Sequence, residues 1–148
     1  MAEPNFSIQE ITVAVNDIGA AAERMGEALK GEVDGIESFP QKGIDIDMGG
    51  IWVGDFHIAL VSDHSGSGPV SKLLENRGEG ISEINVKTDD LTAAIAHMKA
   101  QGLQFVSEEP LILKDYPWRG EVYSEVHVVF VHPASNTGVQ IELGQWFK

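Results

Sequence analysis

The chain has 148 residues, 43% of them hydrophobic, which suits one compact domain with a real core and is too many for a disordered chain. Its 23 acidic residues against 10 basic ones give a formal net charge of −13, which argues against a nucleic acid or an anionic membrane as partner. There is no cysteine, so disulfides and thiolate metal sites are excluded, and no signal peptide or long apolar run is evident, so we expect a cytoplasmic protein.

The chain contains an internal repeat. The stretch Glu10–Met25 returns as Glu83–Met98, at an offset close to half the chain length. The identical pairs are Glu10/Glu83, Ile11/Ile84, Val13/Val86, Asp17/Asp90, Ala20/Ala93, Ala21/Ala94 and Met25/Met98. A repeat of this kind indicates a tandem duplication of one α/β unit. We assign one module to residues 8–64 and the other to residues 80–144.

The first module is expected to begin with a strand, because apolar and other residues alternate from Glu10 to Val15. Asn16 or Asp17 then provides the N-cap of a helix that ends near Gly31. The apolar stripe of that helix consists of Ile18, Ala21, Ala22, Met25 and Leu29. Three strands are expected after it, at Glu32–Phe39, Ile44–Val53 and Phe56–Val61, with turn signals at Gly49-Gly50 and Gly54-Asp55.

Residues 65–79 connect the two modules and include a short helix, Val70–Arg77. The second module repeats the order, with a helix capped by Thr88 or Asp89 and ending near Gly102. Its later strands are expected at Gln104–Glu108, Tyr123–Val131 and Thr137–Leu143. The stretch Leu111–Gly120 is interpreted as a loop, either a lid over a ligand or a surface insertion. The order βαβββ, present twice, predicts an α+β fold.

Several segments resemble a known family. They are Ile11–Val15 followed by Asp17, Val70–Ile81, Glu109-Pro110, Phe130–Pro133 and Gly138–Leu143. With the duplicated βαβββ unit, the chain resembles the vicinal oxygen chelate superfamily of glyoxalases, bleomycin-resistance proteins and extradiol dioxygenases. Within it the chain looks most like the methylmalonyl-CoA epimerases. The resemblance implies a glyoxalase-like fold, in which the two modules form a curled mixed sheet around a cleft, and commonly a homodimer.

The resemblance also implies a divalent metal held by four side chains in that cleft. The matching positions here are Glu10 and Glu83 on the first strands and Ala59 and Glu142 on the last strands. Histidine is usual at both first-strand positions, and Ala59 stands where the epimerases have Gln or Glu. Only Glu142 agrees with the pattern, and Ala59 leaves one ligand position vacant.

Three interpretations of these glutamates remain open. Glu10, Glu83 and Glu142 could bind a hard cation such as Mg²⁺, Mn²⁺ or Ca²⁺ together with water. Alternatively the cleft holds no metal and the glutamates act as catalytic proton donors and acceptors, with crowding that raises at least one pKa. In the third interpretation they are ordinary polar residues on a solvated sheet face.

Other residues are expected to line the site. Alternation places Thr12 and Asn85 on the face of the first-strand glutamates and Gln140 on that of Glu142. Further substrate-binding candidates are Asp47, His57, Trp118 and Arg119. The resemblance to the epimerases implies an epimerase or isomerase that transfers a proton at a carbon adjacent to a carbonyl of a small-molecule substrate. The alternative is a non-catalytic binding protein of the bleomycin-resistance type.

Overall fold

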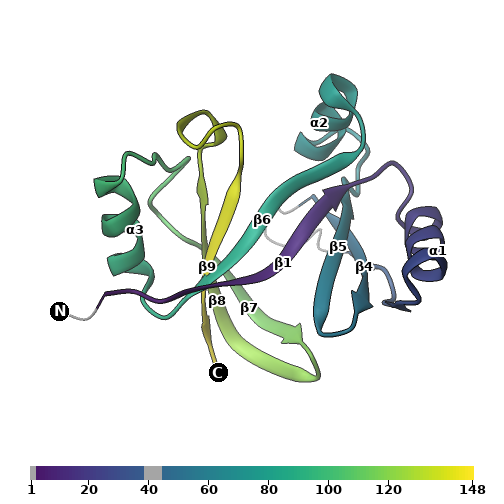
Figure 1. Ribbon diagram of the computed structural model, residues 1–148, viewed down its shortest axis with the longest axis horizontal. Coiled ribbons are helices and arrows are strands. Elements are labelled where there is room, and N and C mark those ends of the chain that lie inside the picture. Colours follow the sequence, from purple (N-terminus) through teal and green to yellow (C-terminus); the bar gives the residue numbers. More distant parts are fainter. Residues whose placement is uncertain (1–2, 39–44) are drawn as a thin grey trace. The chain divides into compact units, whose positions relative to one another are not determined.

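The computed structural model describes residues 3–38 and 45–148 (Figure 1). These residues contain three α-helices, nine β-strands and one short 3-10 helix, Pro133–Ser135. The chain divides into two compact units. Glu10–Ser82 is called the N-terminal unit below, and Met1–Gln9 together with Glu83–Lys148 is called the C-terminal unit.

The N-terminal unit has the strand order β2-β4-β5-β1, with β3 paired to β4. Its β1 and β5 are parallel, and the other pairs are antiparallel. The elements are β1 (Phe6–Ala14, from Glu10 onward), α1 (Ile18–Leu29), β2 (Glu32–Val33), β3 (Glu37–Ser38), β4 (Asp47–Val53), β5 (Phe56–Ser62) and α2 (Pro69–Arg77). The helix expected at Val70–Arg77 is thus confirmed, one residue longer.

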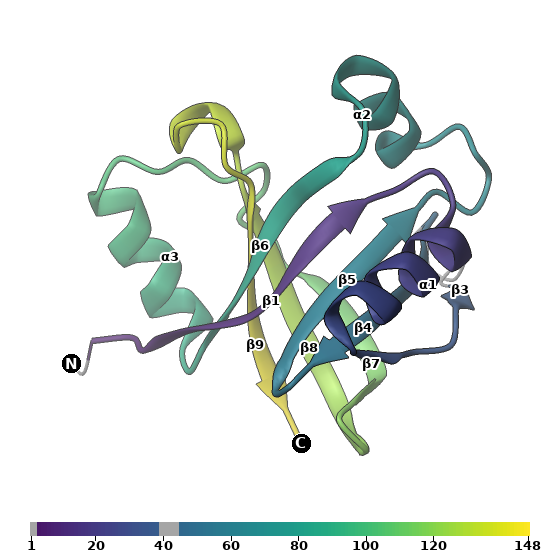
Figure 2. The same ribbon diagram turned by 45° about the vertical axis from the view of Figure 1, so that its right-hand side comes forward.

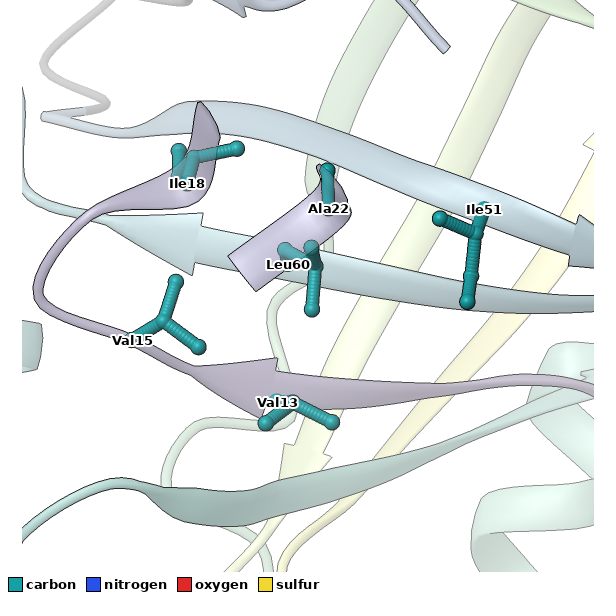
Figure 3. Close-up of a cluster of buried hydrophobic side chains, with 6 residues drawn as sticks. All are labelled: Val13, Val15, Ile18, Ala22, Ile51 and Leu60. Atoms are coloured by element: carbon teal, nitrogen blue, oxygen red, sulfur yellow. The ribbon is translucent and has the colours of Figure 1, made fainter. Parts of the chain in front are cut away.

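Helix α1 covers one face of this sheet, lying across β4 and β5 (Figure 2). Its N-cap is Asp17, whose Oδ1 accepts the Ala20 N–H at 3.0 Å. Burying apolar side chains between helix and sheet stabilises the unit. These side chains form one buried cluster, drawn as sticks in Figure 3: Val13, Val15, Ile18, Ala22, Ile51 and Leu60. Leu29, expected on the same stripe, is instead exposed, and Gly26 is buried on α1.

Two expectations for the N-terminal unit were wrong. Gly49-Gly50 is no turn, because both glycines lie within β4. A Cβ atom at Gly49 would come within 2.7 Å of Ile18 Cγ2, so glycine allows α1 to pack closely on the strand. The single strand expected from residue 32 is divided into β2 and β3. Residues 39–44, which carry the expected boundaries at Phe39 and Ile44, lie outside the described residues.

The C-terminal unit has the strand order β6-β9-β8-β7. Its elements are β6 (Gly80–Thr88, from Glu83 onward), α3 (Leu91–Ala100), β7 (Leu111–Trp118), β8 (Glu121–Val131) and β9 (Ile141–Phe147). Here β6 and β9 are parallel, which repeats the pairing of β1 with β5. The apolar core consists of Leu91, Ala94 and Met98 of α3 against Val129, Val131 and Leu143 of the sheet.

Three boundaries in this unit differ from expectation. The N-cap of α3 is Asp90, whose Oδ1 accepts the Ala93 N–H, rather than Thr88 or Asp89. The strand expected at Gln104–Glu108 is reduced to one bridge between Phe105 and Val131. The last strand begins at Ile141 and continues to Phe147, because the residues before it form turns.

The interpretation of Leu111–Gly120 as a loop was also wrong. Leu111–Trp118 is strand β7, paired antiparallel with β8, and only Arg119 and Gly120 form the hairpin turn. Pro117 is compatible with a strand here because β7 is the last in the order of its unit, where a missing N–H breaks no ladder. The stretch is therefore no lid.

The α+β class with two βαβββ units is confirmed. Across residues 3–38 and 45–148, no helix has the length and apolar character that crossing a membrane requires.

Candidate functional site

An imidazole lies between two carboxylates in the N-terminal unit. His57 Nδ1 is 2.5 Å from Glu10 Oε2, and His57 Nε2 is 2.6 Å from Asp34 Oδ2. The side chains of Glu10 and His57 are only 4% and 6% exposed, whereas that of Asp34 is 38% exposed. We call these three residues the N-terminal triad. It forms a chain of hydrogen bonds from a buried carboxylate to an accessible one.

The strand register explains this arrangement. Glu10 of β1 and His57 of β5 are direct register partners, so their side chains leave the sheet on the same face. Gly50 of β4 makes room for the ring, because a Cβ atom there would lie 2.6 Å from His57 Nε2. Asp34 follows β2 and donates its N–H to the Gly50 carbonyl at 2.9 Å, and the Trp52 ring centroid lies 4.5 Å from that of His57.

The two carboxylates favour a charged His57. Burial is the largest single influence and disfavours the imidazolium. The hydrogen bonds to Glu10 and Asp34, with the charges of these carboxylates, outweigh it, so the pKa of His57 is raised above its ordinary value of 6.5. A protonated His57 donates one N–H to each carboxylate.

In the C-terminal unit, side-chain amides hold the two glutamates. Asn85 Nδ2 donates to Glu142 Oε2 at 3.0 Å, and these residues are register partners between β6 and β9. Gln140 Nε2 donates to Glu83 Oε2 at 3.4 Å. By the repeat, Glu83 corresponds to Glu10, so Gln140 takes the place that His57 takes in the other unit. Each of the three proposed glutamates is thus hydrogen-bonded to a side chain of its own unit.

Thr12 and Asp47 lie at other positions on the strands of the N-terminal unit. Thr12 is buried on β1 as the register partner of Ala59. Asp47 begins β4, accepts the Ser38 hydroxyl at 2.6 Å and lies 2.8 Å from His64 Nδ1. The contact with Ser38, followed by that with His64, lowers the pKa of Asp47. These contacts tie Asp47 to its local strand and loop.

Trp118 and Arg119 lie in the β7–β8 hairpin. The Trp118 ring centroid is 5.7 Å from that of Trp146, which also contacts Tyr116 and Tyr123 edge-on. Arg119 has a left-handed backbone, with φ of 51°, and occupies the hairpin turn. Trp118 therefore belongs to an aromatic group of the C-terminal unit.

Asp34 is the residue of the triad that the sequence did not point to. It falls within Glu32–Phe39, a stretch interpreted as one strand, and no functional role was expected for it. The available signal was Gly50 of the Gly49-Gly50 pair, because a glycine within a strand can mark a close approach of another group. That signal locates the ring of His57, but it does not name the second carboxylate.

Comparison with known proteins defines the class. The chain matches the model of the Glyoxalase/Bleomycin resistance protein/Dioxygenase superfamily over residues 9–119, and it belongs to this superfamily. The glyoxalase-like fold is thereby confirmed. A hypothetical protein from Bacillus halodurans C-125 has a similar solved structure, with a TM-score of 0.79, 26% identity, and coverage of 95% of this chain and 94% of that one.

Several of the similar proteins are epimerases. Mitochondrial methylmalonyl-CoA epimerase of Mus musculus is 23% identical over 139 residues, which are 93% of this chain and 72% of that protein. A Streptomyces coelicolor methylmalonyl-CoA epimerase variant, solved in complex with 2-nitronate-propionyl-CoA, has a TM-score of 0.75 and 23% identity. The alignment covers 94% of this chain and 93% of that one.

The residues present do not fit the four-ligand metal cage that the superfamily resemblance implies. Ala59 is fully buried and ends in a methyl group, which cannot coordinate a metal. Glu10 already has Oε2 hydrogen-bonded to His57. Within the part of the chain that is described, no three His, Asp or Glu side chains are grouped to hold a metal ion. A hard-cation site at Glu10, Glu83 and Glu142 stays a prediction, because these residues are divided between the two units.

Proposed function

We propose that this chain is an epimerase-type enzyme that moves a proton at the carbon next to the carbonyl of a small acyl thioester. The observation that carries the proposal is the orientation of Glu142 by Asn85, at 3.0 Å. Of the paired positions Ala59 and Glu142, only the second has a side chain able to take a proton. The epimerase relatives, which match 93% of this chain or more, supply the reaction type.

The hydrogen bond from Asn85 makes Glu142 a suitable base. The side chain is part-buried on β9, where a carboxylate keeps fewer water contacts than on an open surface. Each carboxylate oxygen has two lone pairs, so a hydrogen bond to Oε2 fixes the group without removing its capacity to accept a proton. An oriented carboxylate of this kind is a common general base.

The step itself is a simple proton transfer. The C–H bond next to the carbonyl breaks, its electron pair forms the enolate, and the proton binds the Glu142 carboxylate. A proton from water then adds to the opposite face of the enolate and inverts the configuration, while Glu142 releases its proton to the solvent. Because the side chains present do not fit the four-ligand metal cage, protein side chains alone take part in this step.

Acyl-CoA thioesters are the substrate class to test first. The S. coelicolor relative is in complex with 2-nitronate-propionyl-CoA. Methylmalonyl-CoA is not singled out as the substrate, because the ligand positions that the resemblance associates with that reaction differ here at Glu10, Glu83 and Ala59.

The test is solvent-deuterium incorporation into a panel of acyl-CoA thioesters, followed by mass spectrometry. We expect the parent protein to incorporate deuterium, Glu142→Gln to lose at least about 100-fold in rate, and the exposed control Glu109→Gln to match the parent. Thermal unfolding of each variant verifies that it is folded. A Glu142→Gln protein that exchanges at the parental rate would overturn the role of Glu142.

The same panel separates the enzyme from its alternative. A thioester that binds in calorimetry but gains no deuterium with the parent protein would contradict the epimerase proposal and favour a non-catalytic binding protein. We also propose a homodimer. Sedimentation equilibrium is expected to give about twice the chain mass of 16.0 kDa, and a monomer mass would contradict it.

A further inference from the structure

We propose that Lys87 is a catalytic residue of this protein, which donates a hydrogen bond to the carbonyl oxygen of the substrate and stabilises the negative charge of the enolate. This inference rests on the proposed proton transfer, because it concerns the oxygen next to the carbon that Glu142 deprotonates. Its basis lies within the C-terminal unit, where Lys87 of β6 and Glu142 of β9 leave the sheet on the same face.

The register of β6 and β9 places Lys87 beside the proposed base. Asn85 is the partner of Glu142, and Lys87, two residues further on, is the partner of Gly144. Residues two apart on a strand share a face and lie about 7 Å apart. A base about 3 Å from a carbon and a donor about 3 Å from the adjoining carbonyl oxygen are separated by roughly 6–8 Å. The spacing along the strands therefore suits one thioester that contacts both side chains.

The two faces of these strands have different surroundings. Val86 and Leu143, which alternate with Lys87 and Glu142, pack in the apolar core against α3. Lys87 and Glu142 are half-buried and keep part of their surface exposed. A small molecule in solution thus reaches the face of Lys87 and Glu142 and not the opposite one.

Aromatic rings hold the ammonium of Lys87 in place. Its Nζ lies 4.8 Å from the ring centroid of Trp146 and 5.8 Å from that of Tyr123. A ring face attracts a cation without occupying its N–H groups in conventional hydrogen bonds, so these donors remain available to an anionic oxygen. The indole of Trp146 lies over Gly144, because a Cβ atom there would be 3.3 Å from Nε1. These contacts keep the ammonium over the strand that carries Glu142.

The charge of Lys87 is not used in an ion pair within residues 3–38 and 45–148. Glu121 has Lys148 as its partner, at 3.1 Å. Contact with Lys148 and then with Tyr123 lowers the pKa of Glu121, and the more distant charge of Lys87 contributes least. A cation without a carboxylate in direct contact can stabilise negative charge that develops on a substrate.

The step moves no proton to or from Lys87. When the C–H bond breaks, the proton binds Glu142 and the electron pair forms the enolate, whose oxygen becomes negative. Lys87 donates one N–H to that oxygen and offsets its charge. Because the charge is larger in the transition state than in the ground state, this hydrogen bond raises kcat.

The first experiment measures kcat and KM of deuterium exchange for Lys87→Met, Lys87→Arg and the control Lys99→Met. Methionine keeps much of the side-chain length without the charge, and arginine keeps the charge. Lys99 is an exposed lysine of α3 in the same unit. We expect Lys87→Met to lower kcat by about 100-fold or more while KM changes little, and Lys87→Arg to recover about tenfold of that loss. Lys99→Met should match the parent, and thermal unfolding verifies that each variant is folded.

Binding of an anionic analogue provides a readout independent of turnover. The probe is 2-nitronate-propionyl-CoA, the ligand in the S. coelicolor relative. It carries a delocalised negative charge around the carbon next to the carbonyl, whereas propionyl-CoA is uncharged there. Calorimetry should show that the parent binds the nitronate at least about tenfold more tightly than propionyl-CoA, and that Lys87→Met loses this preference.

The outcomes separate this inference from the proposed function. An active parent whose folded Lys87→Met variant keeps the parental kcat, or the parental preference for the nitronate, would overturn this inference alone. A parent that exchanges no thioester would overturn the proposed function and with it the catalytic role of Lys87.

Discussion

Gly50 leaves open the space that the ring of His57 occupies. A Cβ atom at residue 50 would lie 2.6 Å from His57 Nε2 and 2.7 Å from the Ile58 carbonyl oxygen. Real side chains do not approach this closely, so either the ring or the strand would have to move. The glycine thus couples the backbone of β4 to the geometry of the N-terminal triad.

The first prediction concerns this glycine. Gly50→Ala should reduce the free energy of unfolding by about 1–3 kcal/mol, because over-packing forces side chains and backbone apart. Urea denaturation measures the change. Gly35→Ala is the matched control, since nothing lies within 4 Å of a Cβ atom there. Equal stability of the two variants would contradict the close packing of His57 against Gly50.

The second prediction concerns pH and stability. The pKa of His57 is raised in the folded protein above its ordinary value of 6.5, so folding favours the protonated form. The resulting stabilisation is fully present below pH 6.5 and is lost as the pH rises through the folded pKa. Each unit of difference corresponds to about 1.4 kcal/mol.

The measurement compares the unfolding free energies of the parent and of His57→Gln from about pH 5.5 to about pH 9.5, a range that spans the expected transition. The advantage of the parent over the variant should shrink on the alkaline side. Stability curves that remain parallel over the whole range would show that folding does not raise the pKa of His57.

The third prediction concerns the amide that holds Glu142. Asn85→Leu removes the donor at 3.0 Å, and a hydrogen bond to a charged group contributes about 1.5–3 kcal/mol. We expect at least about a tenfold loss in kcat for deuterium exchange. Ser135→Ala is the control, because it removes hydrogen bonds to Gln104 and His132 in the same unit. A parental kcat in Asn85→Leu would show that Asn85 does not orient the base.

The fourth prediction concerns metals. Ala59 has no donor atom and Glu10 is engaged by His57, so we expect chelator treatment to leave the melting temperature and the exchange rate unchanged. The assay uses protein purified without a histidine tag, with elemental analysis before and after treatment. Stoichiometric manganese or zinc whose removal abolishes exchange would contradict a proton transfer that needs no metal.

Much of the fold is local enough to be predicted from the sequence. The switch from alternation to a helical stripe at Asp17 gives β1 and α1, because capping and periodicity act over a few residues. The predictions that were wrong failed because they depend on tertiary packing. Gly49-Gly50 appears as a turn until α1 and His57 are placed against β4. Pro117 appears as a loop residue until β7 is known to be the last strand of its unit.

The site was predictable only in part, for a similar reason. The repeat pairs Glu10 with Glu83 and Ala59 with Glu142, and these equivalences agree with the parallel register of each unit. Glu10 meets His57 only because β1 and β5 are parallel neighbours, a pairing of segments 47 positions apart that no local pattern encodes. Asp34 depends further on the packing of the chain after β2.

One measurement tests the proposed proton transfer without relying on any variant. An optically pure acyl-CoA thioester with a methyl branch next to its carbonyl is incubated with the protein in D2O, and circular dichroism and proton NMR are recorded together. We expect the optical signal to decay while the proton at the branched carbon is replaced by deuterium. A bound thioester that keeps both its configuration and its proton would contradict the proposed function.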